Sequence, residues 1–255
     1  MTGLTALVLA GSRPGRDAFA EAHGTDLKPL IPVGGEPMVR RPVLTLLATD
    51  GIARVLVVSQ QPERIAAVLP ADARTAVSAS AATIAATLVQ LIDDPATQWP
   101  LLVTTADHAL LTSGMIYDLV TGAAGADVAI GLVGEAALMR RLPDTKRTWI
   151  RFRDGGYSGA NLFLLRGPQV RPAIEKWRAV EQDRKKGLRL LLSLGPLALV
   201  GAVLRLRTLD QTLRTVGRKL GLKLVAVRMS DPLAAVDVDK DADLTLVEQL
   251  LRERA

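Results

Sequence analysis

A glycine turn followed by cationic side chains has the composition of a phosphate-binding loop. Gly11 ends the apolar run 4–10, and Arg13, Arg16 and Lys28 follow it. Glycine lets the backbone approach a ligand closely, and exposed amides in such a turn hold phosphate oxygens. The motif GSRPGR matches neither G-x-G-x-x-G nor G-x-x-x-x-G-K-[ST], which excludes a dinucleotide-binding turn and a P-loop. A surface turn with solvated arginines remains the alternative interpretation.

Aspartates elsewhere in the chain have the chemistry of magnesium ligands. Asp107 follows the apolar run LLVTTA, so it is expected at the carboxyl end of a strand. Asp237 and Asp239 are separated by one residue, and an extended chain points both to the same side. Mg²⁺ is usually held by one or two carboxylates together with substrate phosphates. The alternative is helix capping, the role expected for Asp241 or Asp243.

The arrangement of apolar runs predicts one α/β domain over residues 1–255. Strand-like runs lie at 4–10, 54–59, 101–105, 127–133, 161–165 and 222–229. Helix-like stretches lie at 37–50, 62–69, 79–92 and 113–122. This alternation predicts a Rossmann-like, mostly parallel mixed sheet flanked by helices on both faces. Ligands of such sheets bind beyond the carboxyl ends of the strands, where Gly11 and Asp107 are expected.

A basic, apolar segment at 171–221 is predicted to be a helical insert within this domain. Between Arg171 and Arg228 the chain has 14 basic and 4 acidic residues, whereas the remainder has 18 and 22. This imbalance argues for a local anionic partner. Three interpretations are open. The insert is a helical subdomain that closes over a substrate or forms a homodimer interface, a peripheral contact with an anionic membrane, or ordinary core.

Local signals within this segment refine the expectation. Thr208 and Gln211 predict a capping box, and Gly221 is suited to the end of the helix that follows it. Trp177 beside Arg178 favours the membrane interpretation, because aromatic and basic side chains gather at membrane surfaces.

Composition excludes several classes of site. The chain has no cysteine, which rules out disulfides, thiolate metal sites and a cysteine nucleophile, and its two histidines argue against a histidine-rich metal site. No G-x-S-x-G elbow is present. The N-terminus resembles a first strand rather than a signal peptide, so a cytoplasmic location is expected, with membrane association through the insert left open.

The stretch LVLAG…R…LKPLIPVGGEPM resembles the signature of the MobA-like NTP transferase family. These nucleotidyltransferases are related to molybdenum-cofactor guanylyl- and cytidylyltransferases and to sugar-nucleotide pyrophosphorylases, and they have the nucleotide-diphospho-sugar transferase type of fold. In the family a glycine-rich loop wraps the NTP phosphates, and a lysine before a P-x-x-G turn offsets their charge. By position, the loop corresponds to Ala10, Gly11, Ser12 and Arg13, with Arg16 as the alternative arginine, and the lysine corresponds to Lys28.

The resemblance extends to the remaining site residues. TTADHALLT resembles the family's strand before A-D-x-P, and DVDKDADL resembles its D-[IV]-D segment, which implies a Mg²⁺ site of Asp107, Asp237 and Asp239. The usual proline of this motif is absent, since Ala109 stands at its position, and His108 either contacts substrate or packs beside the site. By resemblance, Ser78 and Ser80 are candidates for contacts with base and ribose, although helix N-capping explains them equally well. Gly159 and Asn161 match an acceptor-lining strand.

The resemblance implies transfer of NMP, with CMP favoured over GMP, from CTP or GTP to a small acceptor that carries a phosphate or phosphonate. Pyrophosphate would leave, and the catalytic residues would be Arg13, Lys28 and Asp107. Such an acceptor is already anionic, so alignment and charge neutralisation suffice without a general base. No nucleic acid is expected as a partner. The alternatives are a glycosyltransferase of the related nucleotide-sugar fold and a non-catalytic relative that binds a membrane or partner.

Overall fold

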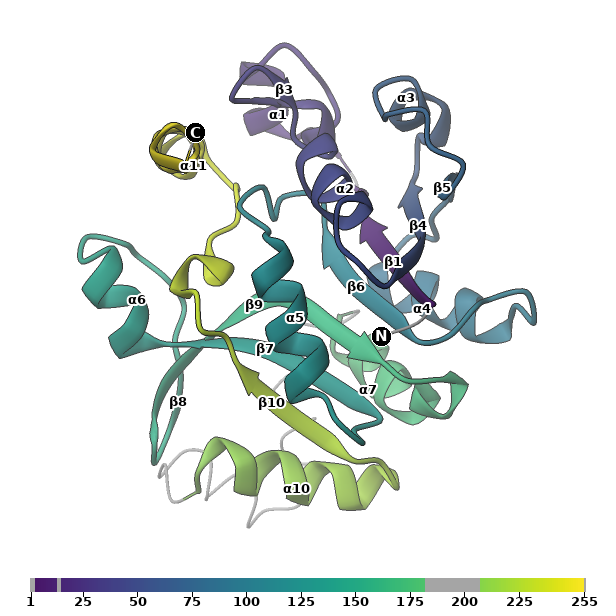
Figure 1. Ribbon diagram of the computed structural model, residues 1–255, viewed down its shortest axis with the longest axis vertical. Helices are drawn as coiled ribbons and strands as arrows, with labels where there is room; N and C mark the ends of the chain where they lie inside the picture. Colours follow the sequence, from purple (N-terminus) through teal and green to yellow (C-terminus); the bar gives the residue numbers. More distant parts are fainter. Residues whose placement is uncertain (1–2, 13–14, 182–206, 255) are drawn as a thin grey trace.

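The computed structural model describes residues 3–12, 15–181 and 207–254 (Figure 1). Its centre is an eight-stranded sheet in the order β10-β7-β9-β6-β1-β4-β5, with β8 paired to β9. The sheet strands are β1 Leu4–Leu9, β4 Ile52–Ser59, β5 Thr75–Ala79, β6 Leu101–Thr105, β7 Val128–Gly134, β8 Ile150–Phe152, β9 Gly155–Leu165 and β10 Leu224–Arg228. A separate two-stranded hairpin consists of β2 Pro32–Val33 and β3 Glu36–Pro37.

Strand direction follows the predicted α/β pattern, with β9 as the reversed strand. β1 pairs in parallel with both β4 and β6, β4 pairs in parallel with β5, and β7 with β10. β9 is antiparallel to β6, β7 and β8. The prediction of a mostly parallel mixed sheet is therefore confirmed. The carboxyl ends of β1, β4, β5 and β6 consequently meet at one edge.

Helices cover both faces of this sheet. They are α1 Ala18–Ala22, α2 Arg40–Leu47, α3 Pro62–Ala66, α4 Ile84–Asp93, α5 Ser113–Gly122, α6 Glu135–Arg141, α7 Arg171–Glu181, α10 Leu209–Leu220 and α11 Asp241–Arg254. Buried side chains of α2, α5 and α11 belong to the apolar cluster on one face, whereas those of α4 and α7 belong to the cluster on the other. Figure 1 shows α5 in front of the sheet and α7 behind it.

The central strand β1 is apolar at every position except Thr5, because both of its faces are buried. Ala6 and Val8 belong to one apolar cluster and Leu7 to the other, as the two-residue period of a strand requires. Leu7 is fully buried, and burying such a side chain stabilises a fold by about 1.5–3 kcal/mol. This rigid strand ends at the turn that contains Gly11.

Element boundaries differ from the sequence prediction in several places, of which three concern helices. The predicted helix 79–92 starts too early, because Ala79 is the last residue of β5 and a short loop follows it. Helix α4 begins after Thr83, whose side chain accepts the N–H of Ala86. The predicted helix 37–50 is shorter, since Pro37 belongs to the β2–β3 hairpin. Helix α6 was not predicted.

The ends of segment 171–221 pack on the sheet, and residues 182–206 lie outside the described part. Helix α7 packs against α4, and α10 packs against β10. The capping box of Thr208 and Gln211 is present, and Gly221 ends α10 in a left-handed conformation, so both local predictions are confirmed. In the described ranges, no helix combines the length and apolarity that crossing a membrane requires.

Gly217 lets the chain fold back from α10 into β10. A Cβ at this position would lie 2.4 Å from the backbone oxygen of Leu222. Alanine normally stabilises a helix interior by about 1 kcal/mol relative to glycine, but this contact is with backbone that cannot move away easily. Gly217→Ala is therefore expected to lower the free energy of unfolding by at least about 1 kcal/mol, since overpacking costs about 1–3 kcal/mol.

Gly114 provides the matched control, because the nearest atom to its added Cβ is the Thr112 hydroxyl at 3.7 Å. Gly114→Ala in α5 should leave stability unchanged or raise it. Urea unfolding monitored by circular dichroism measures both changes. A Gly217→Ala protein as stable as the unmodified chain would contradict this account of the α10–β10 connection.

Candidate functional site

A cavity of about 1040 Å³ lies at the carboxyl edge of the sheet. Residues from the ends of β1, β4, β5 and β6 line it, together with the turn after β1 and the loop before α4. Of the predicted site residues, the cavity is lined by Gly11, Ser12, Arg16, Lys28, Ser80, Asp107 and Asp239. The parallel strands thus bring together residues from four separate parts of the sequence, as the switch-point rule anticipates.

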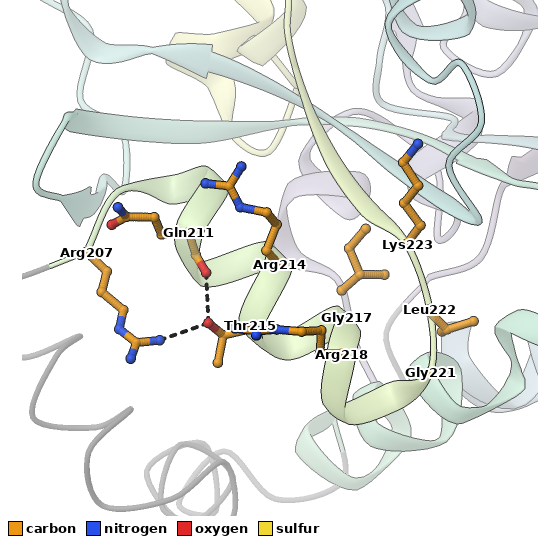
Figure 2. A pocket seen from close by; sticks show the side chains of 10 residues that line it. Arg207, Gln211, Arg214, Thr215, Gly217, Arg218, Gly221, Leu222 and Lys223 are labelled. Atoms are coloured by element: carbon orange, nitrogen blue, oxygen red, sulfur yellow. Dashed lines mark hydrogen bonds between the residues drawn. The ribbon is translucent and has the colours of Figure 1, made fainter.

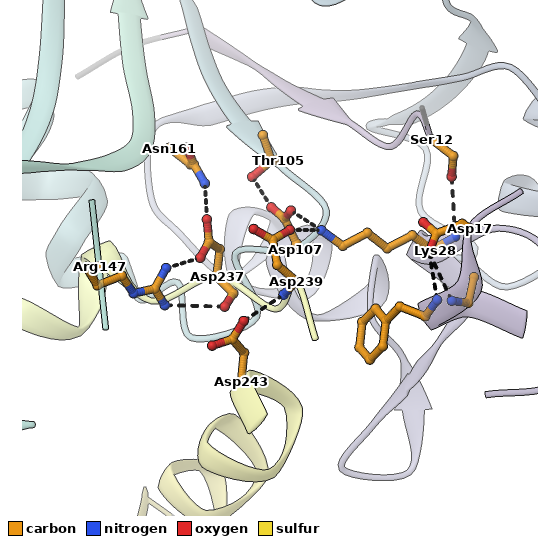
Figure 3. A network of polar contacts seen from close by, with 12 residues as sticks. Ser12, Asp17, Lys28, Thr105, Asp107, Arg147, Asn161, Asp237, Asp239 and Asp243 are labelled. Carbon is orange, nitrogen blue, oxygen red and sulfur yellow. Dashed lines mark hydrogen bonds and ion pairs between the residues drawn. The ribbon is translucent and has the colours of Figure 1, made fainter. Parts of the chain in front are cut away.

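Three of the residues that line this cavity form an ion-pair bridge (Figure 3). The Nζ atom of Lys28 is 2.7 Å from Oδ2 of Asp107 and 2.5 Å from Oδ1 of Asp239. The side chains of Lys28 and Asp107 are 18% and 20% exposed, whereas Asp239 is 58% exposed. One ammonium therefore holds two carboxylates that are 132 positions apart in the sequence.

Further hydrogen bonds hold Lys28 and Asp107 in place. The backbone N–H of Lys28 donates to Oγ of Ser12 at 3.3 Å. Oγ1 of Thr105 donates to Oδ1 of Asp107 at 2.5 Å, which leaves the other carboxylate oxygen for the lysine. The N–H of Val238 donates to the carbonyl of Asp107 at 3.2 Å and joins the aspartate segment to the end of β6.

The pKa of Lys28 reflects two opposed effects. Burial alone would lower this pKa, but the neighbouring carboxylates of Asp107 and Asp239 outweigh it, and the pKa is raised. The ammonium is therefore charged at neutral pH. Its positive charge attracts two negative charges within a partly buried site, where such interactions are screened less than at the surface.

Asp237 lies beside the bridge but faces other partners. Nδ2 of Asn161 donates to its Oδ2 at 3.1 Å, and the guanidinium of Arg147 pairs with its Oδ1 (Figure 3). Arg147 and Asp237 are 13% and 21% exposed. Arg147 was not predicted, because it lies in an irregular polar loop whose sequence gives no sign of a buried partner.

The backbone of Asn161 has an unusual conformation. Its φ is 47°, and it is the one non-glycine residue with positive φ among the described positions. The β7–β9 pairing shifts register between Ile130 and Leu132, opposite this residue. Asparagine tolerates the left-handed region better than most residues. The irregularity directs the Asn161 amide at Asp237, and such outliers cluster at functional sites.

The turn after β1 is held by a side chain that was also not predicted. Oε1 of Gln60 accepts the N–H of Ser12 at 3.0 Å. A Cβ on Gly11 would lie 2.9 Å from the Gln60 amide, so a larger residue would displace this contact. Ala10 is fully buried, and its N–H donates to Val58. The turn is therefore anchored to the neighbouring strand β4.

The remaining predicted residues have different surroundings. Arg13 lies outside the described residues. Arg16 is at the rim of the cavity, where its guanidinium pairs with Glu21 at 2.7 Å and is largely exposed. Ser78 and Gly159 are exposed and are not among the residues that line the cavity.

His108 packs beneath the site rather than in it. It is 1% exposed, its Nδ1 is 3.2 Å from the Thr104 hydroxyl, and it does not line the cavity. Burial lowers the pKa of His108 to about 4, so the ring is neutral at neutral pH. Of the two sequence interpretations of this histidine, the geometry favours packing.

The structure does not present a ready three-carboxylate metal site. Within the described ranges, no group of three or more His, Asp or Glu side chains is arranged to hold a metal ion. Asp107 and Asp239 converge on one cation, whereas both carboxylate oxygens of Asp237 are engaged by Arg147 and Asn161.

A second cavity of about 900 Å³ lies along α10, a helix of the basic segment 171–221. Its described lining includes Arg207, Arg214, Arg218 and Lys223 and no acidic residue. These cations are spread along the helix and the turn after it rather than directed at one point (Figure 2). Leu209, on the apolar face of α10, is buried against the sheet. Contact of segment 171–221 with an anionic membrane stays a prediction.

Substitutions at Asn161 separate its backbone strain from its hydrogen bond. Asn161→Gly loses the bond to Asp237 and should destabilise the protein by about 1 kcal/mol. Asn161→Ala loses the same bond and must also place a Cβ in the left-handed region, which costs about 1–2 kcal/mol more. Urea unfolding of the two variants measures the difference. Equal stabilities would show that the positive φ is not imposed by the fold.

Comparisons with known proteins show the fold and the family of this chain. A hypothetical transferase from Thermus thermophilus is 31% identical, with a TM-score of 0.80 over 96% of this chain and 100% of that one. A 4-diphosphocytidyl-2C-methyl-D-erythritol synthase from Anaerococcus prevotii, 12% identical, shares the fold with a TM-score of 0.61 over 98% and 96% of the two chains. No curated protein matches the sequence. The model of the MobA-like NTP transferase domain matches residues 6–196, and the chain therefore belongs to the MobA-like NTP transferase family of nucleotidyltransferases.

Proposed function

We propose that this nucleotidyltransferase uses Mg²⁺ to transfer NMP, with CMP favoured, from an NTP to a small acceptor that bears a phosphate or phosphonate. An acceptor oxygen attacks the α-phosphorus, the bond to the β-phosphate oxygen breaks, and pyrophosphate leaves. The observation that carries the proposal is the Lys28 bridge to Asp107 and Asp239, beside the glycine turn in one cavity.

The donor atoms of the bridge fit a magnesium ion. Oδ2 of Asp107 and Oδ1 of Asp239 approach the same ammonium, so two hard oxygen donors converge on one cationic position. Mg²⁺ commonly takes one or two carboxylates and completes its shell with waters and substrate phosphates rather than with an all-protein cage. When bound, it would neutralise the charge that develops on the phosphates. We assign the two metal ligands to Asp107 and Asp239.

The other residues of the site bind and align the substrates. The Gly11 turn receives the phosphates, and Lys28 moves from its carboxylates toward them and offsets their charge. The family resemblance implied Asp237 as a metal ligand, but in this proposal it positions the Asn161 amide at the acceptor side of the site. Arg147 fixes the Asp237 carboxylate. Catalysis then depends on alignment and charge neutralisation.

The glycosyltransferase alternative lacks its metal motif at this strand. A D-x-D motif would need a second carboxylate two positions after Asp107, where the sequence has Ala109, a buried residue. The intervening His108 is buried and outside the cavity. That alternative also gives Lys28 no role. The site therefore favours nucleotidyl transfer.

Charge-neutral substitutions test the assignment. Lys28→Met and Asp107→Asn should each lower pyrophosphate release by at least about 100-fold, because charge stabilisation of the reacting phosphates is a large term in such reactions. CTP and GTP, each with Mg²⁺ and a panel of phosphorylated acceptors, are the substrates. Asp50 and Lys240 are exposed residues of the same types, and Asp50→Asn and Lys240→Met are the matched controls. Turnover retained in Asp107→Asn would refute the metal assignment.

Removing the lysine should have the opposite effect on metal binding without nucleotide. Lys28 occupies the position between the two carboxylates that a cation would take, so a free metal ion must displace it. Lys28→Met is therefore expected to bind Mn²⁺ about tenfold more tightly, since the carboxylates lose their competing charge. Electron paramagnetic resonance of free Mn²⁺ measures this affinity. Equal affinity in the unmodified and Lys28→Met proteins would contradict the shared position.

A further inference from the structure

Trp177 lines the cavity that contains Lys28 and Asp107, although the sequence analysis associated its segment with a membrane. It lines the cavity together with Ile84 and Thr87 of α4. The start of α7 meets the end of α4 through the ion pair between Arg171 and Asp93. The two helices therefore run in opposite directions, and Trp177 lies level with the first turn of α4. An indole in this position is part of the nucleotide site rather than of an outward-facing surface.

The indole is held by the sheet behind it. Its ring centroid is 6.1 Å from that of Phe163 on β9, with the two planes 38° apart. Trp177 also packs against the apolar cluster that α4 and α7 share. A partly buried aromatic ring fixed in this way is a rigid wall, and a planar ligand can stack on it with little loss of conformational entropy.

The loop before α4 also lines this cavity and contains a hydroxyl group with no hydrogen-bond partner among the described residues. The N–H of Ala81 donates to Oγ1 of Thr87 at 3.0 Å, and Ser80 donates its N–H to the carbonyl of Ser59 at 2.8 Å, so the loop backbone is fixed. Oγ of Ser80 is shielded from solvent and has no hydrogen-bond partner among residues 3–12, 15–181 and 207–254. A buried polar group without a partner is costly. A ligand atom at this end of the cavity would satisfy it.

We propose that Trp177 and Ser80 form the seat of the nucleobase. The indole stacks against the face of the base, and the Ser80 hydroxyl pairs with its polar edge. The inference rests on the proposed function, which supplies the NTP. It adds Trp177 of α7 as a residue that contacts the base. Stacking tolerates any base because every base has a π-face. Discrimination between bases is therefore assigned to the hydroxyl and the adjacent backbone, and affinity to the tryptophan.

Intrinsic fluorescence tests the proposal on the intact chain. The protein contains three tryptophans, Trp99, Trp149 and Trp177. A Trp99→Phe, Trp149→Phe variant leaves Trp177 as the reporter, and its emission should be quenched by CTP or GTP with Mg²⁺. Inorganic triphosphate with Mg²⁺ should leave the emission unchanged, since it has no base. The control reporter is Trp99, which precedes β6 at the opposite edge of the sheet and should respond to neither probe.

Calorimetry of substituted proteins supplies an independent measurement. Trp177→Ala should weaken binding of CTP and of GTP about tenfold each, whereas Trp177→Phe should retain most of the affinity and inorganic triphosphate should bind both variants equally. Ser80→Ala should change the ratio of the CTP and GTP affinities. If Trp177→Ala does not fold, the fluorescence experiment with Trp177 in place still tests the stacking.

The outcomes separate this inference from the function on which it rests. NTP binding by calorimetry with no change in Trp177 emission would overturn the nucleobase seat and leave the proposed function standing. Equal weakening of NTP and inorganic triphosphate by Trp177→Ala would also overturn it, since the residue would then act on the phosphates. Absence of any NTP binding to the unmodified protein would overturn both.

Discussion

One lysine that pairs with two aspartates is the interaction on which the site depends. Lys28, Asp107 and Asp239 come from distant parts of the sequence, and each alone would be an uncompensated charge at the edge of an apolar core. Their convergence requires β1 and β6 to lie side by side in parallel and the final segment to return to the same edge. The apolar sheet therefore determines which charges meet, and the charges determine what the cavity can bind.

A second layer of polar contacts stabilises this arrangement. The backbone of Val238 joins the aspartate segment to Asp107, and Arg147 and Asn161 hold Asp237 on the other side. The irregular pairing of β7 and β9 makes the conformation of Asn161 available. Strain at one residue is thus supported by a long strand on each side. The result is a site whose parts are pre-positioned on regular secondary structure, which favours alignment of two substrates.

The apolar pattern made the fold predictable, whereas the site was predictable only in part. Strands such as β1 and β6 are buried on both faces, so continuous apolar runs identify them, and the residues that end them, Gly11 and Asp107, follow directly. Strand β5 was missed because Thr75–Ala79 is short, small and partly exposed.

The contacts of Gln60, Arg147 and Trp177 could not be read from sequence, since each depends on a tertiary neighbour far along the chain. Lys28 and its carboxylates were recognised as candidates, but their mutual pairing, and the separate partners of Asp237, required the folded chain.

The most direct measurement is anomalous diffraction from crystals grown with Mn²⁺ and a non-hydrolysable CTP or GTP analogue. The account predicts one manganese peak shared by Asp107, Asp239 and the phosphates, with the Lys28 ammonium turned to the phosphates. A nucleotide bound elsewhere, or a Lys28 bridge unchanged beside it, would contradict the account.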